Sequence, residues 1–251
     1  LPINQIIHGD CLEVMKTFPK ESINTVLTDP PFFLPSQHYA SRDKKWTKKL
    51  SDLSIVKNHF SEVFKECERI LKWNGHLLVS CDPVSYPLFF ESAYELFDII
   101  RCLVWYKGKN YFPLGKGAWR HSFELILHSR NSGAYFLKEN RQDVIECRVV
   151  PNQKRLHPAE KPVRLLVGLL RACTPSHGIV VDPFIGAGST AVACKYLGLS
   201  YIGIELDEGY IDISKKRLRT IDKIQEIPKF AKNGNIIKPK KKERTLLDVF
   251  R

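Results

Sequence analysis

Residues 178–205 read GIVVDPFIGAGSTAVACKYLGLSYIGIE. A short β-type run is followed by a glycine-rich turn, a helical pattern and a second strand that ends at Glu205. The turn matches G-x-G-x-x-A, whose glycines let the backbone turn tightly and approach a ligand at a helix N-terminus. An acid ending the second strand is suited to accept hydrogen bonds from ribose hydroxyls. The stretch predicts a ribose-binding unit, against the plainer alternative of packing glycines and a glutamate that caps a helix.

The same alternation of strands and helices extends through the rest of the chain. A helical stripe is predicted over 54–71, ending at the KWNG turn with Gly75 as its stop, and a strand follows at 76–82. Strands that alternate with helices imply an α/β fold with a mostly parallel sheet covered by helices on both faces. Residues 1–226 are therefore predicted to form one domain, followed by a basic tail at 227–251.

The charge balance indicates a polyanionic partner. The chain has 39 Lys and Arg against 27 Asp and Glu, a formal charge of +12 in 251 residues. Such an excess is typical of nucleic-acid-binding proteins, although a solvated basic surface has the same composition. The seven scattered cysteines contain no C-x-x-C pair, so we expect neither a disulfide framework nor a metal site. No apolar run is long enough to span a bilayer, and a cytoplasmic location is expected.

A second motif, TDPPF at residues 28–32, ends a strand early in the chain. Asp29 supplies a carboxylate, while Pro30 and Pro31 stiffen the chain and leave carbonyl groups free to accept hydrogen bonds. Phe32 adds an aromatic face. A carboxylate, free carbonyls and a ring at a strand end predict a binding site rather than a structural turn.

Together, TDPPF, HPAEKP (157–162) and DPFIGAGST followed by GIELDE resemble the DNA methyltransferases that modify exocyclic amino groups. The catalytic motif precedes the cofactor motif, as in the circularly permuted class called β. The resemblance covers about residues 4–218 and implies a Rossmann-like methyltransferase fold with S-adenosylmethionine as cofactor. It implies that Asp29 and the Pro30 carbonyl hold the target amino group, and that Phe32 stacks on a base flipped out of the duplex.

The resemblance also implies the residues that bind the cofactor. Glu205 would hold the ribose, the glycine turn would lie against the methionine part, and Asp10 would lie near the adenine. The expected cofactor-binding residues are Asp10, Cys11, His157, Lys161, Asp182, Phe184, Gly186, Gly188, Ser189, Thr190 and Glu205.

Recognition of the DNA sequence is expected in segments outside these motifs. The stretch 131–156 is short for the family, so the loops 33–52 and 107–120 are further candidates. Both loops interleave basic and aromatic side chains that suit phosphates and unstacked bases. The expected DNA-binding residues are Lys44, Lys45, Trp46, Lys107, Lys109, Lys116 and Arg120, although solvated surface positions would look the same.

Family members with Asp at the position of Asp29 are mostly adenine N6 enzymes, so the resemblance favours methylation of adenine in double-stranded DNA. Cytosine N4 methylation, RNA methylation and an inactive DNA-binding module are the alternatives. A nicotinamide dehydrogenase would fit the glycine turn, but nothing in TDPPF supplies hydride chemistry. A restriction partner and a homodimer are left open by the sequence.

The C-terminal segment KPKKKERTLLDVFR joins a lysine cluster to a short apolar motif. RTLLDVF resembles the peptides that dock replication proteins on sliding clamps, with Leu247 and Phe250 as anchors. The match is degenerate because Arg244 replaces the leading Gln. Attraction to DNA, or packing of the segment on its own domain, are the other interpretations.

Overall fold

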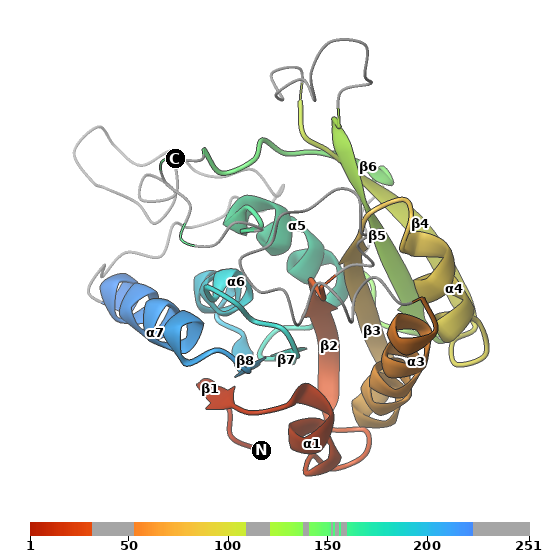
Figure 1. The fold of residues 1–251 in the computed structure, drawn as a ribbon, viewed down its shortest axis with the longest axis horizontal. Helices are drawn as coiled ribbons and strands as arrows, with labels where there is room; N and C mark the ends of the chain where they lie inside the picture. Colours follow the sequence, from red (N-terminus) through yellow and green to blue (C-terminus); the bar gives the residue numbers. More distant parts are fainter. Residues whose placement is uncertain are drawn as a thin grey trace.

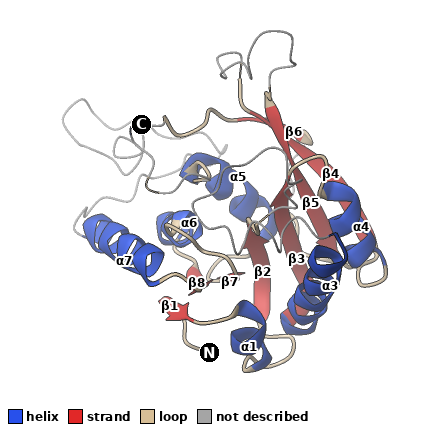
Figure 2. Ribbon diagram, viewed as in Figure 1, coloured by secondary structure: helices blue, strands red, loops and turns tan. Residues whose placement is uncertain are grey.

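The computed structural model describes residues 1–31, 53–108, 121–137, 141–151, 153, 156 and 160–222. These residues form an eight-stranded sheet with helices on both faces (Figures 1 and 2). The predicted α/β fold is therefore confirmed. The elements are β1 (Gln5–His8), α1 (Cys11–Lys16), β2 (Ile23–Thr28), α3 (Leu53–Ile70), β3 (Leu71–Cys81), α4 (Tyr86–Tyr94), β4 (Ile99–Tyr106), β5 (Phe123–Arg130), β6 (Val144–Glu146), α5 (Val163–Cys173), β7 (Ile179–Asp182), α6 (Ser189–Leu197), β8 (Ser200–Glu205) and α7 (Glu208–Asp222).

The sheet has the strand order β1-β8-β7-β2-β3-β5-β4-β6. All neighbouring strands pair in parallel except β5, which is antiparallel to both β3 and β4. The sheet is mostly parallel, as predicted. Strand β6 lies within the stretch 131–156, for which the sequence showed no regular pattern.

Two hydrophobic cores lie on opposite faces of the sheet. Helices α5, α6 and α7 pack on one face, and α1, α3 and α4 on the other (Figure 1). Successive residues of the central strands alternate between the cores, since Leu27 and Val180 belong to the first and Val26 and Val181 to the second. Strands buried on both faces read as continuous apolar runs, which is why β2 and β7 were recognisable in the sequence.

Strands β7 and β2 meet at the topological switch point of the sheet. The helix that follows β7 covers one face, whereas α3, which follows β2, covers the other. Ligands of open α/β sheets bind at the carboxyl ends of strands that diverge in this way. The two sequence motifs DPPF and DPFIGAG begin at the ends of these two strands.

The predicted helix stop at Gly75 is wrong. Helix α3 ends at Ile70 and β3 begins at once, so Gly75 lies inside a strand. A Cβ atom at Gly75 would come within 2.9 Å of the Lys72 carbonyl oxygen and 3.0 Å of the Asn24 carbonyl oxygen. The glycine therefore serves close backbone approach at the start of the sheet. Among the described residues no helix is long and apolar enough to cross a membrane.

Candidate active site

Asp29 stands directly after β2, at the carboxyl edge of the sheet. Every residue of β2 is buried, and the chain emerges at Asp29, whose side chain is 21% exposed. Pro30 is buried behind it and Pro31 is exposed. Oxygen Oδ1 of Asp29 is buried and has no hydrogen-bond partner among the described residues. A buried acceptor without a partner is costly, and it marks a place where a ligand can donate a hydrogen bond.

The other carboxylate oxygen of Asp29 belongs to a buried set of ionised side chains. Lys161 Nζ lies 2.5 Å from Asp29 Oδ2 and 3.2 Å from Glu124 Oε2. Lys107 Nζ lies 2.7 Å from Glu124 Oε1. We call Asp29, Lys161, Glu124 and Lys107 the charged cluster. Its two lysines also lie over the ring of buried Trp105, with Nζ 5.3 Å (Lys107) and 6.0 Å (Lys161) from the ring centroid.

The charged cluster is assembled from four separate segments. Glu124 of β5 pairs in register with Trp105 of β4, and the side chains of such a pair lie on the same face of the sheet. Lys107 follows β4, and Lys161 precedes α5. Alternating charges explain why two lysines remain buried, because each ammonium group has a carboxylate partner.

Burial and neighbouring charges shift the pKa values of the charged cluster in different directions. Burial raises the pKa of Asp29 to about 6, because the opposing effect of Lys161 is only partial and Glu124 adds repulsion. Burial alone would raise the pKa of Glu124, but the ammonium groups of Lys161 and Lys107 outweigh it and lower that pKa. Burial alone would lower the pKa of Lys161, yet Asp29 and Glu124 raise it. Of the two carboxylates, Asp29 is therefore the one that gains a proton first as the pH falls below neutral.

A second acid, Asp182, ends the neighbouring strand β7. Its Oδ1 accepts hydrogen bonds from Thr28 Oγ1 at 2.9 Å and from the Phe184 amide at 3.1 Å, and its Oδ2 accepts one from Thr190 Oγ1 at 2.6 Å. Burial raises the pKa of Asp182 to about 7. Because Asp182 joins β2, the start of the glycine turn and α6, we assign it a structural part in shaping the site.

The glycine turn has the backbone conformation that its sequence predicts. Gly186 and Gly188 have φ angles of 51° and 82°, in the left-handed region that favours glycine, and α6 begins at Ser189. A Cβ atom at Gly188 would lie 2.9 Å from the Cβ of Ser214 in α7. The glycines thus serve both turn geometry and helix packing, and the N-terminus of α6 lies directly behind the turn.

Glu205, at the end of β8, is tied to the same turn. Its Oε2 accepts a hydrogen bond from the Gly186 amide at 2.9 Å, and its Oε1 accepts from the amides of Leu206 and Asp207 at 2.9 and 3.0 Å. These bonds satisfy part of each oxygen and leave further lone pairs. The carboxylate is therefore held in one orientation beside the glycine turn, with capacity for a ligand hydroxyl.

Asp10 and Cys11 have structural contacts at the start of α1. Asp10 is exposed and caps the helix, accepting hydrogen bonds from the amides of Leu12 at 2.9 Å and Glu13 at 3.4 Å. Cys11 is buried, and burial raises the pKa of its thiol to about 12. Residue Gly9 donates its amide to the Glu205 carbonyl oxygen, which places this segment next to the end of β8.

An ion pair that the sequence analysis missed holds the HPAEKP segment in place. Glu160 Oε1 lies 2.8 Å from Arg217 of α7, and both side chains are buried. Arg217 also donates hydrogen bonds to the Ala187 carbonyl oxygen and to Ser189 Oγ in the glycine turn. Arg217 lies on the buried face of α7 with Ser214, Leu218 and Ile221, and a charged residue on an apolar face was the signal that would have revealed it.

The structure brings residues of two predicted motifs, TDPPF and HPAEKP, into contact. Other predicted site residues are not among those that the structure describes. Asp29 and Lys161, predicted for different ligands, are in direct contact. Lys107, predicted to contact DNA, is buried and paired with Glu124, so its predicted surface position is wrong. The remaining predicted residues lie outside the described part of the chain: Phe32, Lys44, Lys45, Trp46, Lys109, Lys116, Arg120, His157, Leu247 and Phe250.

Comparison with known proteins agrees with this geometry. A family model described as DNA methylase, N6_N4_Mtase, matches residues 23–216, which include both strand-end motifs. The chain belongs to this family of DNA methyltransferases. The resemblance inferred from the motifs is thereby confirmed.

Curated relatives match the DNA methyltransferase over most of its length. Type II methyltransferase M.HinfI of Haemophilus influenzae is 29% identical, covering 87% of this chain and 69% of its own. M2.LlaDCHI of Lactococcus lactis subsp. cremoris is also 29% identical, covering 85% and 88%. DNA adenine methyltransferase YhdJ of Escherichia coli K12 is 26% identical, covering 93% and 90%.

Solved structures share the fold. The M1.HpyAVI complex with S-adenosylmethionine superimposes with a TM-score of 0.64 at 24% identity, covering 85% of this chain and 98% of that one. The cytosine-N4-specific PvuII methyltransferase superimposes with a TM-score of 0.68 at 20% identity, covering 85% of each. Because a cytosine-N4-specific enzyme shares this fold, the fold by itself does not select adenine as the target base.

Proposed function

We propose that this methyltransferase transfers a methyl group from S-adenosylmethionine to the N6 atom of an adenine flipped out of double-stranded DNA. The observation that carries the proposal is Asp29 at the switch point of the sheet: one oxygen is held by Lys161, and the other is buried with no hydrogen-bond partner among the described residues. In this proposal Asp29, Pro30, Pro31 and Phe32 form the catalytic motif.

An exocyclic amino nitrogen is a poor nucleophile because its lone pair is delocalised into the ring. Asp29 Oδ1 and the Pro30 carbonyl oxygen would accept the two amino hydrogens and return the lone pair to the nitrogen. The bound cofactor supplies an electrophilic methyl group on a sulfonium. Transfer of that methyl group would leave the sulfonium as a neutral thioether and the amino nitrogen with one proton to lose, and Asp29 is the adjacent base that would accept it. Orientation and electrostatics then account for most of the acceleration.

The charged cluster would determine the orientation and the pKa of Asp29. Lys161 holds Oδ2, so the other oxygen faces the incoming amino group in a single orientation. Glu124 fixes Lys161 in turn, and Lys107 fixes Glu124. Glu124 and Lys161 are thus positioning residues: they touch Asp29 or each other, and they determine its orientation and pKa.

The fit of the cofactor is supported by the arrangement around β7 and β8. Gly186 and Gly188 form a tight turn with positive φ angles, and Ser189 and Thr190 begin α6 directly after it, where free backbone amides suit an anionic ligand group. Glu205 keeps free lone pairs for the ribose hydroxyls beside this turn. We assign the adenine end to the side of Asp10 and Cys11, and the methionine end to the side of Asp182 and Phe184.

Adenine is supported by Asp as the first residue of the catalytic motif and by the adenine specificity named for YhdJ. The DNA contacts are assigned to segments 33–52 and 109–120, which lie outside the described residues, and to the stretch 131–156. Clamp docking by Leu247 and Phe250 remains a prediction from the sequence, which leaves a homodimer open.

The test is incubation of the protein with unmethylated genomic DNA and S-adenosylmethionine, followed by nucleoside mass spectrometry. We expect N6-methyladenine, at a rate reduced about 10²–10⁴-fold in Asp29→Asn. The matched control Asp212→Asn alters an exposed aspartate on α7 and should keep full activity. N4-methylcytosine would overturn the choice of base and keep the mechanism. If no base is methylated in any DNA while RNA is modified, the proposal that DNA is the substrate is wrong.

A further inference from the structure

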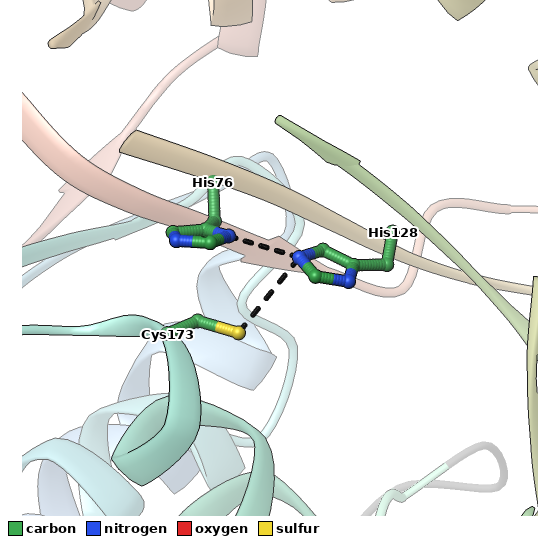
Figure 3. A group of neighbouring side chains, drawn as sticks. All are labelled: His76, His128 and Cys173. Carbon is green, nitrogen blue, oxygen red and sulfur yellow. Dashed lines mark hydrogen bonds between the residues drawn. The ribbon is translucent and has the colours of Figure 1, made fainter. Parts of the chain in front are cut away.

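Three side chains from β3, β5 and α5 converge in the core on the side opposite the active site edge (Figure 3). His76 Nδ1 lies 2.9 Å from His128 Nε2, and Cys173 Sγ lies 3.9 Å from the same nitrogen. One ligand atom from each residue lies within 4.8 Å of the others. We call His76, His128 and Cys173 the neutral cluster.

The positions of the three residues in the fold explain this convergence. His76 pairs in register with Arg130, and Leu78 pairs with His128, so the two histidines are diagonal neighbours on one face of an antiparallel pair. That face is covered by α5, whose last residue is Cys173. His128 lies four positions along β5 from Glu124 of the charged cluster, on the order of 13 Å of extended chain.

Hydrogen bonding fixes which nitrogen of His76 has a free lone pair. His76 Nε2 contacts the Tyr135 carbonyl oxygen and must donate its hydrogen there. Its Nδ1 is therefore an acceptor, and it faces His128 Nε2. A carbonyl that orients an imidazole in this way is the usual outer partner of a metal-binding histidine.

Burial favours the metal-binding form of the two imidazoles and disfavours that of the thiol. Burial lowers the pKa of His76 to about 4 and of His128 to about 3, so both imidazoles are neutral at pH 7. Burial raises the pKa of the Cys173 thiol to about 12, while Arg141 and Arg130 act in the opposite direction. The Phe136 ring lies 6.4 Å from each imidazole ring and covers the cluster.

We propose that His76 Nδ1, His128 Nε2 and Cys173 Sγ bind a structural zinc ion. Nitrogen and thiolate donors are the set that zinc prefers, and zinc bonds of about 2.0–2.1 Å to nitrogen and 2.3 Å to sulfur require donors roughly 3.3–3.7 Å apart. Small side-chain shifts reach these separations. The thiol releases its proton to solvent as the zinc–sulfur bond forms, and the ring hydrogen of His128 moves from Nε2 to Nδ1 so that Nε2 can bind the ion. Nothing is oxidised or reduced. Water would occupy the fourth position.

Such an ion would join two strands to the C-terminal end of α5. The backbone at this end is already held on β2, because Thr25 Oγ1 donates a hydrogen bond to the Cys173 carbonyl oxygen at 3.3 Å. The opposite end of α5 follows Lys161 of the charged cluster. The zinc ion would therefore stabilise the helix that carries a positioning residue, without contacting the substrate.

The test is the metal content of the full chain purified without a histidine tag. Mass spectrometry of the metal should find about one zinc per chain, and cobalt(II) added to the chelated protein should give a thiolate-to-cobalt charge-transfer absorption. Cys173→Ser should remove this absorption and reduce the zinc content at least tenfold. The matched control Cys102→Ser changes an exposed cysteine and should change neither.

Wild-type protein without zinc, without the cobalt absorption and with a melting temperature that chelator leaves unchanged would overturn the proposal. The three side chains would then be a metal-free hydrogen-bonded group. These measurements on the wild-type chain decide the question even if Cys173→Ser fails to fold.

Discussion

Helix α5 connects two buried polar groups that differ in charge. The charged cluster lies beside its N-terminal end, through Lys161, and the neutral cluster lies at its C-terminal end, through Cys173. Strand β5 contributes Glu124 to the first and His128 to the second. The two clusters share α5, β5 and one face of the sheet, so the difference in their chemistry comes from the immediate neighbours of each.

The comparison shows how a buried polar group remains in one protonation state. In the charged cluster, carboxylates and ammonium groups alternate, and their attraction offsets the loss of hydration. In the neutral cluster no carboxylate takes part among the described contacts, and burial keeps both imidazoles uncharged. The charged cluster keeps the Asp29 carboxylate able to accept a hydrogen bond from substrate. The neutral cluster keeps imidazole nitrogens able to bind a metal ion.

Separating the HPAEKP segment from the glycine turn should have the largest effect. Arg217→Met leaves Glu160 buried without its partner, and we expect the free energy of unfolding to fall by about 3–5 kcal/mol, measured by urea denaturation. The double variant with Glu160→Met removes both charges and should recover part of this loss. Equal destabilisation of the single and double variants would contradict an ion-pair role.

Removing the cation from the charged cluster should impair catalysis more than folding. Lys161→Met should lower kcat by about 10²–10³-fold, because Asp29 loses its orientation and its charge partner. Asp29 in the wild-type protein has a pKa of about 6, so kcat/KM should fall as the pH drops below that value, where Asp29 gains a proton. In Lys161→Met this decline should begin at higher pH. Lys215→Met, on the exposed side of α7, is the control and should retain the wild-type profile.

Acidification should distinguish the neutral cluster through stability. The pKa values of His76 and His128 are lower in the folded state, so the unfolded chain binds more protons and stability falls as the pH decreases from about 6.5 towards 4. We expect about 1–2 kcal/mol per histidine between pH 6.5 and 5. His128→Gln should reduce this slope in urea denaturation at several pH values. An unchanged slope would show that the histidines do not cause it.

We expect the smallest effect from Glu124→Gln, whose pH profile should shift in the direction opposite to that of Lys161→Met. Glu124 raises the pKa of Asp29, so Glu124→Gln should move the acid limb of kcat/KM to lower pH. The amide oxygen can still accept from a lysine, which limits damage to the fold. If the acid limb of kcat/KM moves to higher pH in both Glu124→Gln and Lys161→Met, the variants disrupt the site generally and the charges do not control the pKa of Asp29.

Within one contiguous stretch, the sequence was informative about the site. The glycine turn, its strand and its helix obey local rules of backbone conformation, so G-x-G-x-x-A predicted a tight turn between strand and helix, and Gly186 and Gly188 have positive φ angles there. Asp29 was found for the same reason, since a polar residue that ends an apolar run marks a strand end. Gly75 was misinterpreted because its role is close approach to another strand, which leaves no local pattern.

The alternating α/β order, the two strand-end motifs and, through their resemblance to a family, the class of reaction could all be inferred from the sequence. Only the tertiary structure placed Lys161 on Asp29, 132 positions away, and His128 on His76, 52 positions away. It also buried Lys107, which the sequence suggested was exposed. Local propensities depend on neighbours along the chain, whereas a side chain's charge partner and burial depend on which strands and helices pack together.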